Sequence, residues 1–236
     1  MGLETGAMPD IVPLTMRPDI LNPLFVETGS LKGVGPGLAK PLARLGLERV
    51  KDVAYHFPAG WTYRKQVTEL DEADVGLNII VRLVIVDHRS GGSTRAPTRI
   101  HGCDADGNYV SLVFFGRNGG WARKQLPLGE ERIVSGKLEQ YGQELQIIHP
   151  DHIAPPGDSA PPAVEPVYPL SEGLTNNRAG QLVALALERL PELPEWIEPG
   201  LLAQKGWKGW REALAAAHRK DEAALRERLA HDELFA

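Results

Sequence analysis

The chain has 236 residues, of which 42% are hydrophobic and 24% charged, and its formal net charge is −5. This composition is typical of a globular protein with enough length for two small domains, and no apolar run reaches the ~18 residues that a membrane span needs. The single cysteine, Cys103, excludes an internal disulfide framework and a cysteine-based zinc cluster. The expected location is therefore the cytoplasm.

The acidic total conceals an uneven distribution of charge. Residues 28–66 carry seven Lys and Arg against two Asp and Glu, while the acidic excess lies in other segments. The distribution therefore leaves nucleic acid open as a partner, although a charge run is usually just a solvated face.

Residues 1–15 show no periodicity, so we expect a disordered leader or an over-called start that is dispensable. Residues 16–75 are predicted to be helical. A glycine turn, Gly33–Gly37, opens a helix with leucines at i, i+4 and i+7, and a second short helix ends before Pro58. This pattern indicates a helix–hairpin–helix, in which Lys32, Gly33 and Gly35 are candidate phosphate contacts. A glycine-capped hairpin used only for packing is the alternative.

Residues 76–153 are predicted to form a small barrel, because apolar residues recur at every second position in segment after segment. Five strands are expected, with an Asp/Gly turn between the second and third and a connector, Gly116–Gly129, before the fourth. The expected strands are Asn78–His88, Pro97–Cys103, Asn108–Phe115, Arg132–Tyr141 and Glu144–Ile153. Five meander-connected strands of this length favour an OB-fold.

OB-folds bind single-stranded nucleic acid on the face of strands 2 and 3 and with the loops after strands 1 and 4. Phe114 and Phe115 are candidate stacking residues. Alternation places Phe114 on the face of Val110 and Leu112, so Phe114 is the better core candidate and Phe115 the better stacking candidate, although a bulge could exchange them. The candidate phosphate contacts of this region are Arg89, Arg95, Arg99, Arg117 and Lys124. Many OB-folds bind proteins instead, which remains the alternative.

The C-terminal third divides into a proline-rich linker, residues 154–170, and a helical segment, residues 171–236. The linker is expected to be stiff and extended. Beyond it, Thr175 is the expected N-cap of a helix over Asn176–Leu190, and two further helices are expected over Trp207–His218 and Asp221–Leu234.

Motifs for catalysis are not found in these 236 residues. There is no Gly-x-x-x-x-Gly-Lys-Ser/Thr phosphate loop, no His-Glu-x-x-His and no Gly-x-Ser-x-Gly elbow. The histidines have no ligand-like helical spacing, so we expect no catalytic residue and no bound metal.

Several motifs, taken in order, resemble the N-terminal part of the RecG family of ATP-dependent helicases that remodel branched DNA. The matching segments are Leu31–Pro36 through Leu47, Asp52–Pro58, Phe114-Phe115, Gly136-Lys137, His149–Asp151, Pro166–Leu170, Glu172–Leu174, Arg228–Ala230 and Asp232–Leu234. The resemblance runs from about Met16 to the end, and the chain stops where that family's two ATPase lobes would begin. The expected fold is α+β: a helical hairpin, a five-stranded OB barrel and C-terminal helices.

The resemblance implies a wedge that separates the strands of a replication fork or Holliday junction while aromatic residues stack on unpaired bases. It implies branched or single-stranded DNA as partner, a nucleoid-associated cytoplasmic location, and the single-stranded-DNA-binding protein as a further partner. ATP and magnesium are implied only for the motor, so this chain, an engineered or truncated fragment, is expected to need no cofactor and to hydrolyse no ATP. The competing hypotheses are an incomplete helicase that needs a motor supplied elsewhere, and an OB module that binds only proteins.

Overall fold

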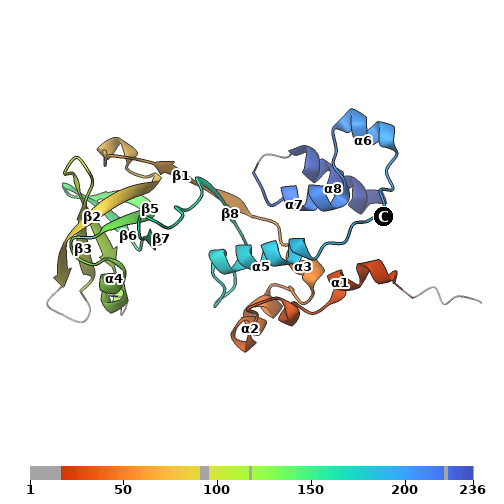
Figure 1. The fold of residues 1–236 in the computed structure, drawn as a ribbon, viewed down its shortest axis with the longest axis horizontal. Helices are drawn as coiled ribbons and strands as arrows, with labels where there is room; N and C mark the ends of the chain where they lie inside the picture. Colours follow the sequence, from red (N-terminus) through yellow and green to blue (C-terminus); the bar gives the residue numbers. More distant parts are fainter. Residues whose placement is uncertain (1–16, 91–95, 117–118, 221–222, 236) are drawn as a thin grey trace, which may run out of the picture. The chain divides into compact units, whose positions relative to one another are not determined.

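The computed structural model describes residues 17–90, 96–116, 119–220 and 223–235 (Figure 1). Two compact units make up the chain. The helical unit consists of the residues up to Ala59 together with those from Pro166 onward, and the barrel unit is Gly60–Glu165. The predicted leader, residues 1–15, lies outside the described residues.

Five strands of the barrel unit form a closed ring, which confirms the predicted OB-fold. They are β2 (Asn78–Ser90), β3 (Thr98–Cys103), β4 (Tyr109–Phe114), β5 (Glu131–Tyr141) and β6 (Glu144–Ile148). The ring runs β2-β3-β4-β6-β5 and closes by pairing β5 with β2. All pairs in the ring are antiparallel except β4 with β6. This connectivity is that of a five-stranded Greek-key barrel.

Alternation along β2 explains why the barrel closes around an apolar interior. Ile79, Leu83 and Ile85 are buried in the core, whereas Arg82 and Val84 between them are exposed. The register between β2 and β3 shifts between Ile85 and Asp87, so a bulge bends the strand there. Helix α4 (Gly119–Gln125), between β4 and β5, packs its fully buried Ala122 into the same core.

The prediction of a single last strand over Glu144–Ile153 is wrong. This segment divides into β6 and β7 (His152–Ala154), and the chain turns between them at His149, which has φ +48°. A positive φ takes the backbone out of the extended region, so one strand cannot continue through it. Two further strands are absent from the sequence prediction: β1 (Gly60–Gln66) and β8 (Val164–Val167), which extend the sheet beyond β2.

The helical unit is built of short helices, and its buried residues form one large core cluster and a small second one at Ala213 and Ala216. Its α-helices are α1 (Asn22–Phe25), α2 (Pro36–Arg44), α3 (Val50–Ala54), α5 (Asn176–Glu188), α6 (Pro199–Lys205), α7 (Trp210–Ala216) and α8 (Ala223–Phe235), with 3-10 turns at Asp19–Leu21 and Thr28–Ser30. The α2–α3 hairpin and the Thr175 cap of α5 agree with the sequence prediction. Helix α6 was not predicted, and Asp221 lies outside the described residues.

Candidate nucleic-acid interface

The two neighbouring phenylalanines at the end of β4 lie on opposite sides of the barrel wall. Phe114 is 2% exposed and belongs to the barrel core, while Phe115, directly after the strand, is 48% exposed. The prediction that Phe114 is the core residue and Phe115 the exposed one is confirmed. Strand alternation explains the difference in exposure, because Phe114 lies on the same face of β4 as the buried Val110 and Leu112.

Two aromatic side chains from other segments pack against these phenylalanines, His149 against both and Trp121 against Phe114. The His149 ring lies 5.7 Å from the ring of Phe115 and 6.2 Å from that of Phe114. Trp121 of α4 is 53% exposed and packs edge-on against Phe114 at 6.4 Å. We call Phe115, Trp121 and His149 the aromatic tip. Sequence reasoning missed Trp121 and His149, since no local pattern joins them to Phe115.

Hydrogen bonds fix the backbone of the aromatic tip. The amide of His149 donates to the Val113 carbonyl at 2.9 Å, and the Phe115 amide donates to His149 Nε2 at 3.3 Å. Because Nε2 accepts a proton donor, the neutral His149 ring carries its proton on Nδ1. The exposed ring of Phe115 therefore projects from a backbone that is held in place.

The predicted arginines of β2 and β3 share the outer face of the barrel. Arg89 lies opposite Arg99, and Arg99 lies opposite Val113, two residues before Phe115. Arg89 forms an ion pair with Asp87 at 2.7 Å, whereas Arg99 has no ion-pair partner among the described residues. Lys124 is exposed on α4. Arg95 and Arg117 lie outside the described residues.

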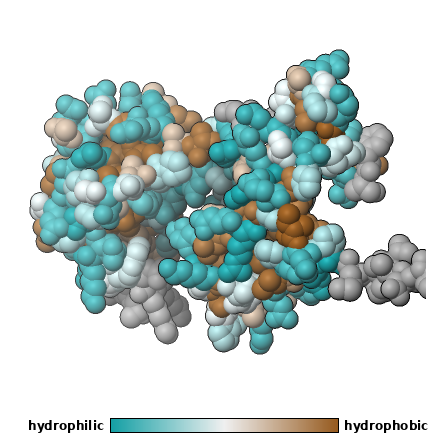
Figure 2. Space-filling model, turned by 45° about the vertical axis from the view of Figure 1, so that its right-hand side comes forward, coloured by the Kyte–Doolittle hydropathy of each residue, from teal (hydrophilic) through white to brown (hydrophobic). Residues whose placement is uncertain are grey.

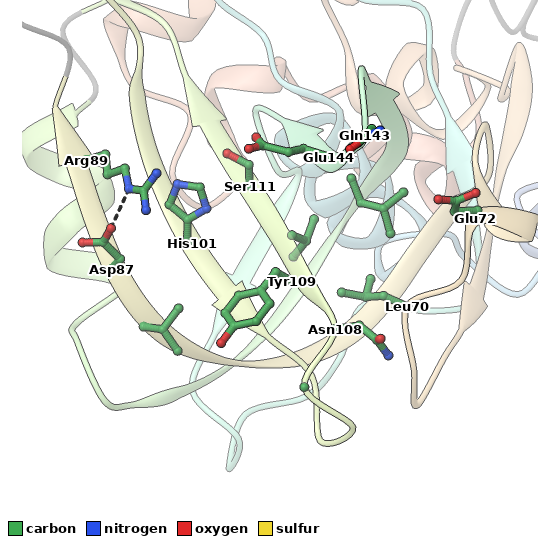
Figure 3. Close-up of a pocket in the computed structure, with 14 residues that line it drawn as sticks. Leu70, Glu72, Asp87, Arg89, His101, Asn108, Tyr109, Ser111, Gln143 and Glu144 are labelled. Carbon is green, nitrogen blue, oxygen red and sulfur yellow. Dashed lines mark hydrogen bonds and ion pairs between the residues drawn. The ribbon is translucent and has the colours of Figure 1, made fainter.

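A hollow of about 670 Å³ occupies the outer face at the other end of β4 (Figure 3). Its lining comes from β2, β3, β4 and β6, from the turns before β4 and β6, and from the segment between β1 and β2. We call it the face hollow; its polar and aromatic lining residues are Glu72, Asp87, Arg89, His101, Asn108, Tyr109, Ser111, Gln143 and Glu144. Sequence reasoning identified only Arg89 of this set.

Asp104 fixes one rim of the face hollow. Its carboxylate accepts hydrogen bonds from the amides of Leu70, Asp106 and Asn108 and from the Asn108 side chain, at 2.7–3.0 Å. Burial alone would raise the pKa of Asp104, but these donors together hold the pKa below its ordinary value. The β3–β4 turn and the Leu70 segment are thereby tied to one ionised side chain.

The glycine turn of the helical unit uses its glycines in two ways. Gly33 has φ +81°, and a Cβ there would lie 2.1 Å from Arg178 Nη2, so this position is packed against α5. Arg178 also donates to the Lys32 carbonyl at 3.3 Å. Gly35, the N-cap of α2, has open space around it. The hairpin therefore shows both a packing role, at Gly33, and an accessible helix N-terminus, at Gly35.

Comparison with known proteins places this geometry in a family. The model of the RecG wedge domain matches residues 29–189, more than half of the chain. The chain belongs to the RecG wedge domain family. An ATP-dependent DNA helicase RecG from Acidithiobacillus ferridurans is 31% identical over 196 residues, which cover 81% of this chain and 28% of the relative. The RecG of Escherichia coli K12 is 27% identical over 202 residues, covering 82% and 28%.

A solved structure shows the same fold as this RecG wedge domain protein. RecG bound to a three-way DNA junction superposes with a TM-score of 0.72 at 22% identity, over 90% of this chain and 30% of the other. The chain thus spans less than a third of the length of the relatives that it matches. Among the described residues, no helix is both long and apolar enough to cross a membrane.

Proposed function

We propose that this RecG wedge domain binds branched DNA, such as a replication fork or a Holliday junction, and that Phe115 stacks on an unpaired base where two strands part. The observation that carries the proposal is the half-exposed Phe115 ring on a fixed backbone, with Arg99, for which the described residues offer no ion-pair partner, on the same outer face. Aromatic rings stack on bases and guanidiniums donate hydrogen bonds to phosphates, which is the combination that single-strand binding requires.

The DNA complex of the structural relative supports this proposal, since that RecG is bound to a three-way junction. Trp121, exposed beside Phe114, is the natural second stacking surface of the aromatic tip. Arg89, Arg95, Arg99, Arg117 and Lys124 are proposed to neutralise phosphates around the barrel. Lys32 is proposed to do the same at the glycine turn, where the backbone amides of Gly33 and Gly35 would donate hydrogen bonds to a phosphate and Arg178 adds a cation.

The wider expectations stay predictions. They are that the chain alone hydrolyses no ATP, that it acts in DNA repair and recombination, that it is located at the nucleoid, and that the single-stranded-DNA-binding protein is a partner.

A titration of the 236-residue chain against a three-way fork and a duplex of equal length tests the proposed function. Tighter binding to the fork, with log Kd rising linearly with log salt concentration, is expected because phosphate neutralisation releases counterions. Equal affinity for fork and duplex would contradict a wedge that needs unpaired bases. Failure to bind either DNA would favour an OB module that binds only proteins.

A further inference from the structure

Two residues that line the face hollow each have a buried polar atom with no hydrogen-bond partner in the described part of the chain. Ser111 is 2% exposed, and its hydroxyl has no hydrogen-bond partner among the described residues. The same holds for Nε2 of His101, which lies directly opposite Ser111 across the β3–β4 pair. A buried polar atom without a hydrogen-bond partner is costly, so a ligand that supplies partners to both atoms would be favoured.

Long side chains flank these two atoms. Figure 3 shows Arg89 beside His101 and Glu144 beside Ser111. Arg89 and Glu144 are both exposed, and the ion pair of Arg89 with Asp87 is a weak surface pair, so both side chains can change rotamer. A ligand can therefore reach the buried hydroxyl and ring nitrogen by moving two surface side chains, without opening the barrel.

A flat apolar surface lies next to the unpartnered atoms. Tyr109 is 63% exposed and lies two residues before Ser111 on β4, hence on the same face. Its ring lines the hollow (Figure 3). An exposed tyrosine on a sheet is a stacking surface for any planar ring, including a nucleobase.

The charges of the face hollow select against phosphate. Three carboxylates, from Glu72, Asp87 and Glu144, line it together with one arginine, and that arginine is already paired with Asp87. Carboxylate oxygens accept hydrogen bonds from the exocyclic amino groups of bases such as cytosine. Adenine and guanine carry such a group as well, whereas thymine carries none.

We propose that the face hollow holds one unpaired nucleobase bearing an exocyclic amino group, stacked on Tyr109 and hydrogen-bonded to Ser111, His101 and Glu144. The six residue-to-residue steps from Tyr109 to Phe115 span ~20 Å of extended chain, so this site is separate from the aromatic tip. The strand that leaves the tip would cross the outer face with its phosphates near Arg99 and one base turned into the hollow. This proposal rests on the proposed function, because it requires a single strand at the tip.

The test measures binding of the 236-residue chain to two forks that differ only in one unpaired arm, oligo(dC) or oligo(dT). The wild type is expected to bind the dC fork roughly fivefold or more tightly than the dT fork, the range for one good polar base contact. Glu144→Gln should reduce that ratio, because the amide nitrogen of Gln offers thymine a donor. Tyr109→Ala should weaken binding to the dC fork roughly 5- to 100-fold, the range for loss of one stacked base.

Tyr63→Ala is the matched control, because Tyr63 is 51% exposed on β1 and does not line the hollow. Melting curves of all variants show whether each one folds. Equal affinity of the wild type for both forks, or wild-type binding by folded Tyr109→Ala, overturns the base site. If Phe115→Ala still weakens fork binding in that case, the proposed function stands without it. If the wild type binds neither fork, both proposals fail together.

Discussion

Phe114 and Phe115 show how one step along a strand separates stability from binding. Replacing the buried Phe114 by alanine should cost roughly 3–5 kcal/mol of unfolding free energy, the usual price for emptying a core aromatic site. Phe115→Ala should leave folding nearly intact and weaken fork binding by roughly 1–3 kcal/mol, the range for one stacked base. Urea unfolding and fork titration of both variants measure the two effects.

Tyr141→Ala, an exposed aromatic away from the tip, controls for general loss of surface hydrophobicity. Folded Phe114→Ala and Phe115→Ala variants that both bind forks like the wild type would contradict the wedge.

His218 couples the stability of the helical unit to pH. Its Nε2 donates to the Ala54 carbonyl at 2.9 Å, so Nδ1 is the acceptor for the Tyr168 hydroxyl at 3.2 Å and the ring must be neutral. Burial, aided by the nearby His56, lowers the pKa of His218 below its ordinary 6.5, despite the bond to Ala54. Burial also raises the pKa of Tyr168 to about 12, so that hydroxyl keeps its proton at neutral pH.

The sign of this effect follows from proton uptake. With a lower pKa in the folded state, the unfolded chain binds the proton more readily, so His218 favours folding above pH 6.5 and this contribution falls as pH drops below it. Melting temperatures of the wild type and His218→Gln between pH 7.5 and 5 check this. The wild type should lose more stability than the variant on acidification, and parallel losses would rule out His218 as the source.

Individual residues show which parts of the candidate site can be predicted from the sequence. Alternation alone distinguished Phe114 from Phe115. The Asp87–Arg89 ion pair could have been anticipated too, since residues two apart on a strand share a face. Trp121 and His149 could not, because α4 and the β6–β7 turn meet at Phe114 only once the ring of strands has closed.

At the scale of elements, Gly136 of β5 sets how closely β6 and the turn after it can approach. A Cβ on Gly136 would lie 2.5 Å from Ile147 Cγ2 and 3.4 Å from Pro150 Cα. Gly136→Ala should therefore destabilise the barrel by roughly 1–3 kcal/mol through overpacking. Gly120→Ala in α4 is the matched control, because its added methyl meets nothing within 4 Å and alanine favours a helix. Equal unfolding midpoints for the two variants would show that β5 has room to shift.

The elements that the sequence failed to predict depend on distant partners. Strand β1 pairs in parallel with β2, and β8 contains Pro166 and lies at the edge of the sheet next to β1. The buried Arg64 secures this edge, with ion pairs to Asp151 at 2.6 Å and Glu165 at 2.7 Å. The central strands were predictable because apolar residues recur at every second position within each of them. An edge strand is determined instead by the strand that it pairs with, which a local pattern does not reveal.

For the whole molecule, the distribution of charge should decide how binding depends on salt. Arg99→Ala should weaken binding to all DNA sequences alike and reduce the slope of log Kd against log salt concentration by about 1, since one phosphate contact is lost. Arg89→Ala should change the slope less, because Arg89 is already paired with Asp87. Lys205→Ala, which removes a cation paired with Glu227 in the helical unit, is the control. If the slope for Arg99→Ala equalled that of the wild type, Arg99 would not contact a DNA phosphate.

The division of the chain into units has a consequence for the order of events on the ribosome. The barrel unit is continuous in sequence, whereas the helical unit is interrupted by it and uses residues from both sides of the interruption. Leu42, Val50 and Val53 of the first part find their core partners, among them Leu182 and Leu214, only after the whole barrel has been translated. Since chains emerge N-terminus first and domains fold as units, the barrel can be folded before the first helices have met their C-terminal core partners. A nascent chain released within α5 would therefore carry a finished barrel preceded by helices with no core to join.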